Sequence, residues 1–188
     1  MKRTKFPALF LVILMVPCVS ANMGIPVIFV TMPLMLLALL PIILIESLVL
    51  MRYLAKGLKR TIVPVGIANA VTTILGYPIS WGLLFGIGLI TTGGSCGPGF
   101  DTVGKSILTV LLEAAWLCPW EEQIYWTLPI AIIIGLLLAF FISILIEYKI
   151  LKRYFKNLEP KPVWVANMIT YGLLVLFSLI YLLVGIIG

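Results

Sequence analysis

Four long apolar runs, separated by short charged stretches, constrain this chain more than any other feature of its sequence. The runs cover residues 25–51, 62–90, 126–146 and 163–187. Because a helix needs about 20 mostly apolar residues to cross the hydrocarbon core of a bilayer, each run predicts one transmembrane helix. The chain is 62% apolar and 11% charged, which leaves too little polar surface for a soluble domain. We therefore expect an all-α integral membrane protein whose main partner is the lipid bilayer.

Three prolines interrupt the first run, at Pro26, Pro33 and Pro41. Proline lacks an amide hydrogen and disturbs the interior of a helix. We expect either a kinked helix or an extended stretch at the membrane surface, followed by a crossing over residues 33–51.

Residues 1–21 have the composition of a signal peptide. A basic start is followed by a short apolar core, and the small residues Val19 and Ala21 form an A-x-A type of cleavage site. We expect cleavage after Ala21, with an uncleaved anchor as the alternative.

Lysine and arginine concentrate in two of the connections, and short loops rich in these residues stay in the cytoplasm. Four bases and no acid follow the first run, and five bases with two acids follow the third. The middle loop, residues 91–125, has one base and four acids. We expect cytoplasmic basic turns in a bacterial inner membrane, with the middle loop and the C-terminus on the periplasmic or extracellular side. The net charge of +6 comes partly from the first five residues, so it does not indicate nucleic-acid binding.

Cys96 and Cys118 both lie in this middle loop. A disulfide between them would close a loop whose stabilisation is typically about 3 kcal/mol, and two unpaired thiols are the alternative. The sequence contains no histidine, and two cysteines alone do not make a zinc site. We therefore predict no metal and no cofactor.

The middle loop also predicts a helix outside the membrane core. Polar residues recur at helical spacing from Thr102 to Glu113, with apolar residues up to Trp116 between them. This pattern indicates an amphipathic helix of about fifteen residues, too short to cross, lying along the outer interface. A re-entrant segment formed by the Gly-rich run 93–99 is the alternative.

The two halves of the chain share an ordered set of residues. Glu46 and Arg52, with the apolar residues around them, recur in the same order and spacing as Glu147 and Arg153. The returning runs share the pattern Ala-Asn-x-x-Thr, which contributes Asn69 and Thr72 in one copy and Asn167 and Thr170 in the other. We expect two helical hairpins, residues 22–90 and 126–188, that point the same way and are related by a pseudo-two-fold axis along the membrane normal.

The repeated polar residues have a structural and a functional interpretation. Glu46 and Glu147 either pair with a base of their own turn or reach water, or they face the interior and bind a cation, a proton or a basic partner. The Asn and Thr side chains either join helices or line a pathway. Gly82 and Gly86, followed by Gly88, form a close-packing surface for internal contacts or for dimerisation.

No nucleophile in the sequence has a recognisable base beside it, so the residues do not indicate an enzyme. We predict a non-enzymatic scaffold or accessory subunit that packs against other membrane proteins or against copies of itself. The alternative is a small oligomeric transporter or channel that uses the repeated Glu, Asn and Thr positions.

Overall fold

The computed structural model describes residues 25–187, so the predicted signal peptide lies outside the described residues. This part of the chain is mainly helical, and four of its helical segments are long and apolar enough to cross a membrane. They are α2 (Val27–Leu54), the segment Leu58–Thr92, α6 (Ile124–Tyr154) and α7 (Pro160–Ile187). The predicted all-α class is therefore confirmed, with four helices that are long and apolar enough to span a membrane.

The second span consists of three consecutive helical elements. It begins as α3 (Leu58–Val71), continues as a π-helical turn η2 (Thr72–Gly76) and ends as α4 (Tyr77–Thr92). Such π-turns inside α-helices change the direction in which the following side chains point, and they are frequent at functional sites.

The first span begins earlier than the expected crossing at residues 33–51. Helix α2 starts at Val27 and includes Pro33 and Pro41, because the apolar surroundings favour a helix even where single backbone hydrogen bonds are lost. The expected extended stretch is limited to β1 (Ile25–Pro26), which pairs antiparallel with β2 (Trp116–Leu117).

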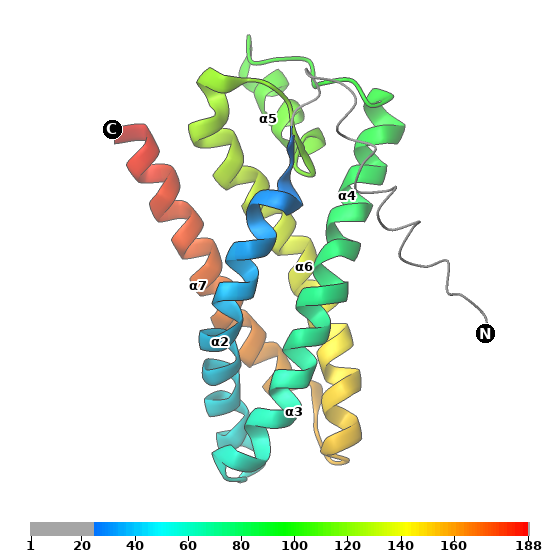
Figure 1. Ribbon diagram of the computed structural model, residues 1–188, viewed down its shortest axis with the longest axis vertical. Helices are drawn as coiled ribbons and strands as arrows, with labels where there is room; N and C mark the ends of the chain where they lie inside the picture. The colour runs from blue at the N-terminus through cyan, green and yellow to red at the C-terminus, as the bar shows by residue number, and fades with distance from the viewer. Residues whose placement is uncertain (1–24, 188) are drawn as a thin grey trace, which may run out of the picture.

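The spans form a bundle in which α2 packs against α3 and α7, and α6 packs against α7 and α3. The turns between α2 and α3 and between α6 and α7 lie at one end of the bundle, and the middle loop lies at the other (Figure 1). The two turns are in contact, since the Lys56 ammonium group lies 4.7 Å from the centre of the Phe155 ring.

A compact apolar cluster fills the bundle next to these turns. Its members come from all four spans and from the second turn, and they are fully or almost fully buried: Leu50, Val65, Ala68, Leu151, Phe155, Leu158, Val163 and Ala166. Small and branched side chains at the centre allow the helix backbones to approach closely, which is how membrane helices gain packing energy.

The outer end of the bundle is covered by α5 (Val103–Leu112), a short 3-10 turn η3 (Glu121–Gln123) and the strand pair. Helix α5 is shorter than the predicted fifteen residues and ends before Glu113. The predicted C-terminal part was wrong because Trp116 belongs to β2, where its backbone pairs with Pro26. The Gly-rich run lies against α5, through hydrogen bonds of Gly97 to Glu113 and of Gly99 to Thr109, so it sits at the end of the bundle.

Candidate functional site

Glu46 lies in the centre of the bundle and is 1% exposed. One carboxyl oxygen, Oε2, accepts a hydrogen bond of 2.6 Å from the side-chain amide of Asn69 on α3. The other, Oε1, lies 2.8 Å from the hydroxyl oxygen of Thr170 on α7. Glu46 therefore connects α2 to one helix of each half of the chain.

Glu147 on α6 also contacts one asparagine and one threonine, and these come from the opposite halves of the chain. It is 2% exposed, and its Oε2 accepts a 2.7 Å hydrogen bond from the amide of Asn167 on α7. Its Oε1 lies 3.2 Å from the hydroxyl oxygen of Thr72. Each glutamate is thus bound by an asparagine from the next span and by a threonine from the other half of the chain. We call these six residues the Glu–Asn–Thr network.

The hydrogens of this network can be counted. Each asparagine amide has two, and the second one goes to the backbone carbonyl of Val65 or Val163. Each threonine hydroxyl has one, and a carbonyl of its own helix lies within reach, at 3.0 Å for Thr72 and 3.2 Å for Thr170. With ionised glutamates, the threonines donate this hydrogen to the carboxyl oxygens. With protonated glutamates, the threonines donate to those carbonyls instead, and their oxygens accept the hydrogen of the carboxyl group. All hydrogens are used in both cases.

The structural interpretation expected the glutamates to pair with bases of their own turns. They do not form such pairs. Arg52 and Arg153 are exposed, and the only ion pair within residues 25–187 joins Lys105 to Asp101. The reason is depth, because α2 and α6 continue about two turns, roughly 12 Å, beyond Glu46 and Glu147. A glutamate side chain is too short to reach the helix end from there.

A small cavity of about 30 Å³ adjoins the network between the two halves. Its polar lining comes from Glu147, from Asn69 and Thr72, and from four residues that the sequence analysis missed: Thr73, Tyr77, Ser143 and Tyr171. Tyr77 donates to Thr31 at 2.6 Å, and the hydroxyl groups of Ser143 and Tyr171 lie 2.6 Å apart. Single tyrosines and serines in apolar helices carry no spacing signal, which is why the sequence analysis could not find them.

The π-helical turn lies beside this cavity and follows directly from the network. It starts at Thr72 and ends at Gly76, where an added Cβ atom would lie 3.4 Å from Ile146. Gly76 thus brings α6 close to the second span at the level where Thr72 meets Glu147. The corresponding part of α7 is an uninterrupted α-helix, so the two halves differ here.

The glycines of α4 do not pack as a group inside the bundle. An added Cβ atom at Gly82 or Gly86 would meet nothing within 4 Å, whereas at Gly88 it would lie 3.1 Å from the carbonyl oxygen of Leu112. Of these three glycines, Gly88 alone serves a close contact with another described part of the chain.

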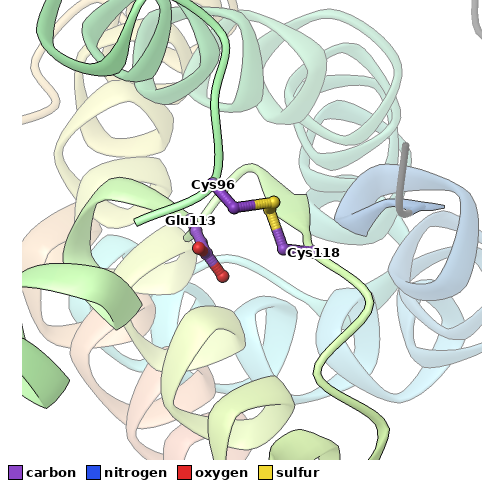
Figure 2. A group of neighbouring side chains, drawn as sticks. All are labelled: Cys96, Glu113 and Cys118. Atoms are coloured by element: carbon purple, nitrogen blue, oxygen red, sulfur yellow. A yellow bond between two sulfur atoms is a disulfide. The ribbon is translucent and has the colours of Figure 1, made fainter. Parts of the chain in front are cut away.

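The predicted cysteine pair lies at bonding distance, and the structure joins Cys96 and Cys118 in a disulfide. Figure 2 shows the Glu113 carboxyl group beside it. This carboxyl group accepts hydrogen bonds from the backbone of Gly97, at 2.6 Å, and of Cys118, and from the indole of Trp120. Partial burial raises the pKa of Glu113, although the hydrogen bonds oppose this effect.

A larger hollow of about 530 Å³ lies where α5 meets the start of α6. Phe100 forms its aromatic wall, with edge contacts to Trp120 and Trp126 at centroid distances of 5.4 Å. Trp120 and Trp126 therefore help to hold the outer loop onto the bundle.

Comparisons with protein-family models, with curated proteins and with solved structures find no match to this chain. Functional assignment therefore rests on its own residues and their geometry.

Proposed function

We propose that the chain is a non-enzymatic scaffold or accessory subunit in a bacterial inner membrane, built as two like-directed helical hairpins that the Glu–Asn–Thr network joins. The observation that carries this proposal is the crossed pairing of each glutamate with an asparagine of its own hairpin and a threonine of the other. Hydrogen bonds between transmembrane helices are worth about 0.6 to 2 kcal/mol each. The network therefore favours one fixed arrangement of the four spans.

Several observations support a pseudo-two-fold repeat, residues 22–90 and 126–188. Buried residues at matching sequence positions meet in the same apolar cluster, as Leu50 does with Leu151 and Val65 with Val163. The two basic turns lie at one end of the bundle, which fits a cytoplasmic side rich in Lys and Arg. Cysteine labelling at Lys56 and Lys156 from either side of intact cells tests this orientation, and labelling of either position from outside would contradict it.

A rigid bundle with uncharged acids suits a structural role. Two ionised carboxylates without a cation would be costly in this environment, whereas neutral acids keep the same contacts without a buried charge. Gly82 and Gly86, open to close approach on α4, provide the surface for a second copy or another membrane protein.

Substitution of the glutamates by glutamine tests the structural role. Glutamine keeps a carbonyl acceptor and a hydrogen donor, so Glu46→Gln and Glu147→Gln, alone and together, are expected to retain the membrane level and thermal stability of the wild type. Glu147→Ala removes both bonds and is expected to destabilise the protein. If the double glutamine variant unfolded or disappeared from the membrane, neutral acids could not be what holds the bundle.

The cavity beside Glu147 favours a second candidate function, a small proton or cation transporter. A volume of about 30 Å³ exceeds the 10 to 15 Å³ that one water molecule needs, and its polar lining could hold water or an ion at the carboxyl group. Proton flux into vesicles containing the purified protein, followed with an internal pH dye, tests this function. Flux that the wild type supports and Glu147→Gln abolishes, at unchanged stability, would replace the scaffold proposal.

A further inference from the structure

The disulfide in the outer loop has the surroundings of a reactive site. Cys96 is exposed, whereas Cys118 and Glu113 are partly buried. The two sulfur atoms and a carboxyl oxygen of Glu113 all lie within 4.8 Å of one another, and Figure 2 shows the carboxyl group on one side of the sulfur–sulfur bond. An incoming thiol can therefore reach Cys96, while the sulfur of Cys118 stays next to an acid.

The segment that carries Cys96 is held in place without the disulfide. The N–H group of Gly97 donates to Glu113 at 2.6 Å, and the N–H and C=O groups of Gly99 both bond the hydroxyl of Thr109, at 3.1 and 2.9 Å. A Cβ atom at Gly97 would lie 2.8 Å from the Cα atom of Thr109, so glycine allows this close contact. Cys96 would keep its position after reduction.

The segment that carries Cys118 is held independently. Its neighbour Leu117 pairs with Ile25 in the strand pair and is buried. The Cys118 backbone bonds Glu113, and its carbonyl accepts a 2.7 Å hydrogen bond from the N–H group of Trp120. Since both halves stay in place when the bond opens, the two sulfurs remain positioned to form it again.

We propose that Cys96 and Cys118 form a redox-active disulfide that accepts two electrons from a dithiol of a partner protein, with Glu113 as the proton donor. A thiolate of the partner attacks Cys96 Sγ and forms a mixed disulfide. The Cys96–Cys118 bond breaks, its electron pair goes to Cys118 Sγ, and that sulfur takes the proton of the Glu113 carboxyl group. The second thiolate of the partner then attacks its own sulfur in the mixed disulfide and releases the Cys96 thiolate, which takes a proton from water. The partner leaves as a disulfide.

Glu113 suits this role because it stays protonated above the usual range of a glutamic acid. Burial raises its pKa, and among the side chains that the structure describes no charged group bonds to it. Asp101 and Lys105, at the start of α5, pair with each other at 2.9 Å, and Glu122 on η3 is exposed. Protonation of the leaving thiolate speeds exchange, because a better leaving group departs faster.

A purely structural disulfide would behave differently. Its reduction would depend on pH only through the attacking thiolate, and loss of the Glu113 acid would not change the rate. The distinguishing measurement is therefore the pH profile of the rate constant, normalised to the concentration of attacking thiolate.

The experiment uses the full chain in lipid nanodiscs, with dithiothreitol as the dithiol and a maleimide–polyethylene glycol label to count the thiols released. For the wild type we expect a normalised rate constant that falls as pH rises and Glu113 loses its proton. Glu113→Gln is expected to be about 100-fold slower or more at the acid end, in line with the usual size of general acid catalysis, and to lose the fall with pH.

Asp101→Asn is the matched control, since it removes another acid of the same loop that does not contact the disulfide. It is expected to keep the wild-type profile. If the normalised rate constant of the wild type did not change with pH, the proposal would be overturned. This result needs no variant, so the test stands even if Glu113→Gln does not fold. Equal profiles for the wild type and Glu113→Gln, or the same loss in Asp101→Asn, would also overturn it.

Discussion

Replacement of Thr170 by valine removes one hydrogen bond between the two halves of the chain while keeping the size of the side chain. The Thr170 hydroxyl is 2% exposed and lies 2.8 Å from Glu46 Oε1. Asn69 continues to bind the other oxygen of that carboxyl group. Thr170→Val therefore leaves Oε1 buried without its partner and affects little else.

The expected cost follows from these contacts. An interhelical hydrogen bond in a membrane contributes about 0.6 to 2 kcal/mol, and a buried polar group left unsatisfied costs about 1 to 3 kcal/mol. The hydroxyl also bonds backbone carbonyls of its own helix, but those carbonyls already take part in the helix. We expect Thr170→Val to lower the free energy of unfolding by about 1 to 2 kcal/mol.

Reversible unfolding of the purified protein in mixed micelles, with tryptophan fluorescence as the signal, measures this change. Thr73→Val is the control for the same change of side chain, because Thr73 is half-buried in the π-helical turn beside the cavity and its hydroxyl makes no side-chain hydrogen bond within residues 25–187. It is expected to change the free energy by less than about 0.5 kcal/mol. If Thr170→Val were no more destabilising than Thr73→Val, the bond between Thr170 and Glu46 would not join the halves.

Three further substitutions test other parts of the structure. Gly97→Ala is expected to destabilise the outer loop by about 1 to 3 kcal/mol, because the added Cβ atom would lie 2.8 Å from Thr109. Limited proteolysis should then cut the loop faster than in the wild type, and an unchanged cleavage rate would contradict this prediction. Tyr171→Phe is expected to cost about 1 kcal/mol in unfolding free energy by removing the 2.6 Å bond to Ser143, and a variant as stable as the wild type would argue against that bond. Because the pKa of Glu113 is raised in the folded protein, this carboxyl group stabilises the fold fully below its pKa in the unfolded chain, and the stabilisation is lost as pH rises through its pKa in the folded protein. The melting temperature of Glu113→Gln should therefore rise relative to that of the wild type as pH is raised, and a constant difference would refute the raised pKa.

The sequence predicted the spans more accurately than their ends. Apolar runs locate the lipid-embedded parts, but helices continue past them when the backbone gains hydrogen bonds, as α6 does through Lys152 and Arg153 to Tyr154. The prediction began the first crossing at Pro33, whereas helix α2 starts at Val27 and continues through Pro33 and Pro41. The signal peptide and the repeat remain predictions.

The sequence predicted which residues belong to the candidate site, but not which of them contact one another. Glu46, Asn69 and Thr72, with their counterparts, were selected because they recur in order. Arg52 and Arg153 recur as well but lie on the surface, because recurrence does not distinguish a buried position from one at a helix end. Trp116, assigned to the outer helix, forms strand backbone instead.

The sequence alone determined that this chain has four helices long and apolar enough to cross a membrane, with polar residues at matching positions within them, because length and apolarity decide insertion one segment at a time. Only the tertiary structure decided that each glutamate meets a threonine of the opposite half and that Glu113 lies beside the disulfide. These contacts depend on how the helices pack, and packing joins residues that are more than a hundred positions apart, such as Glu46 and Thr170. No local pattern encodes such a distance.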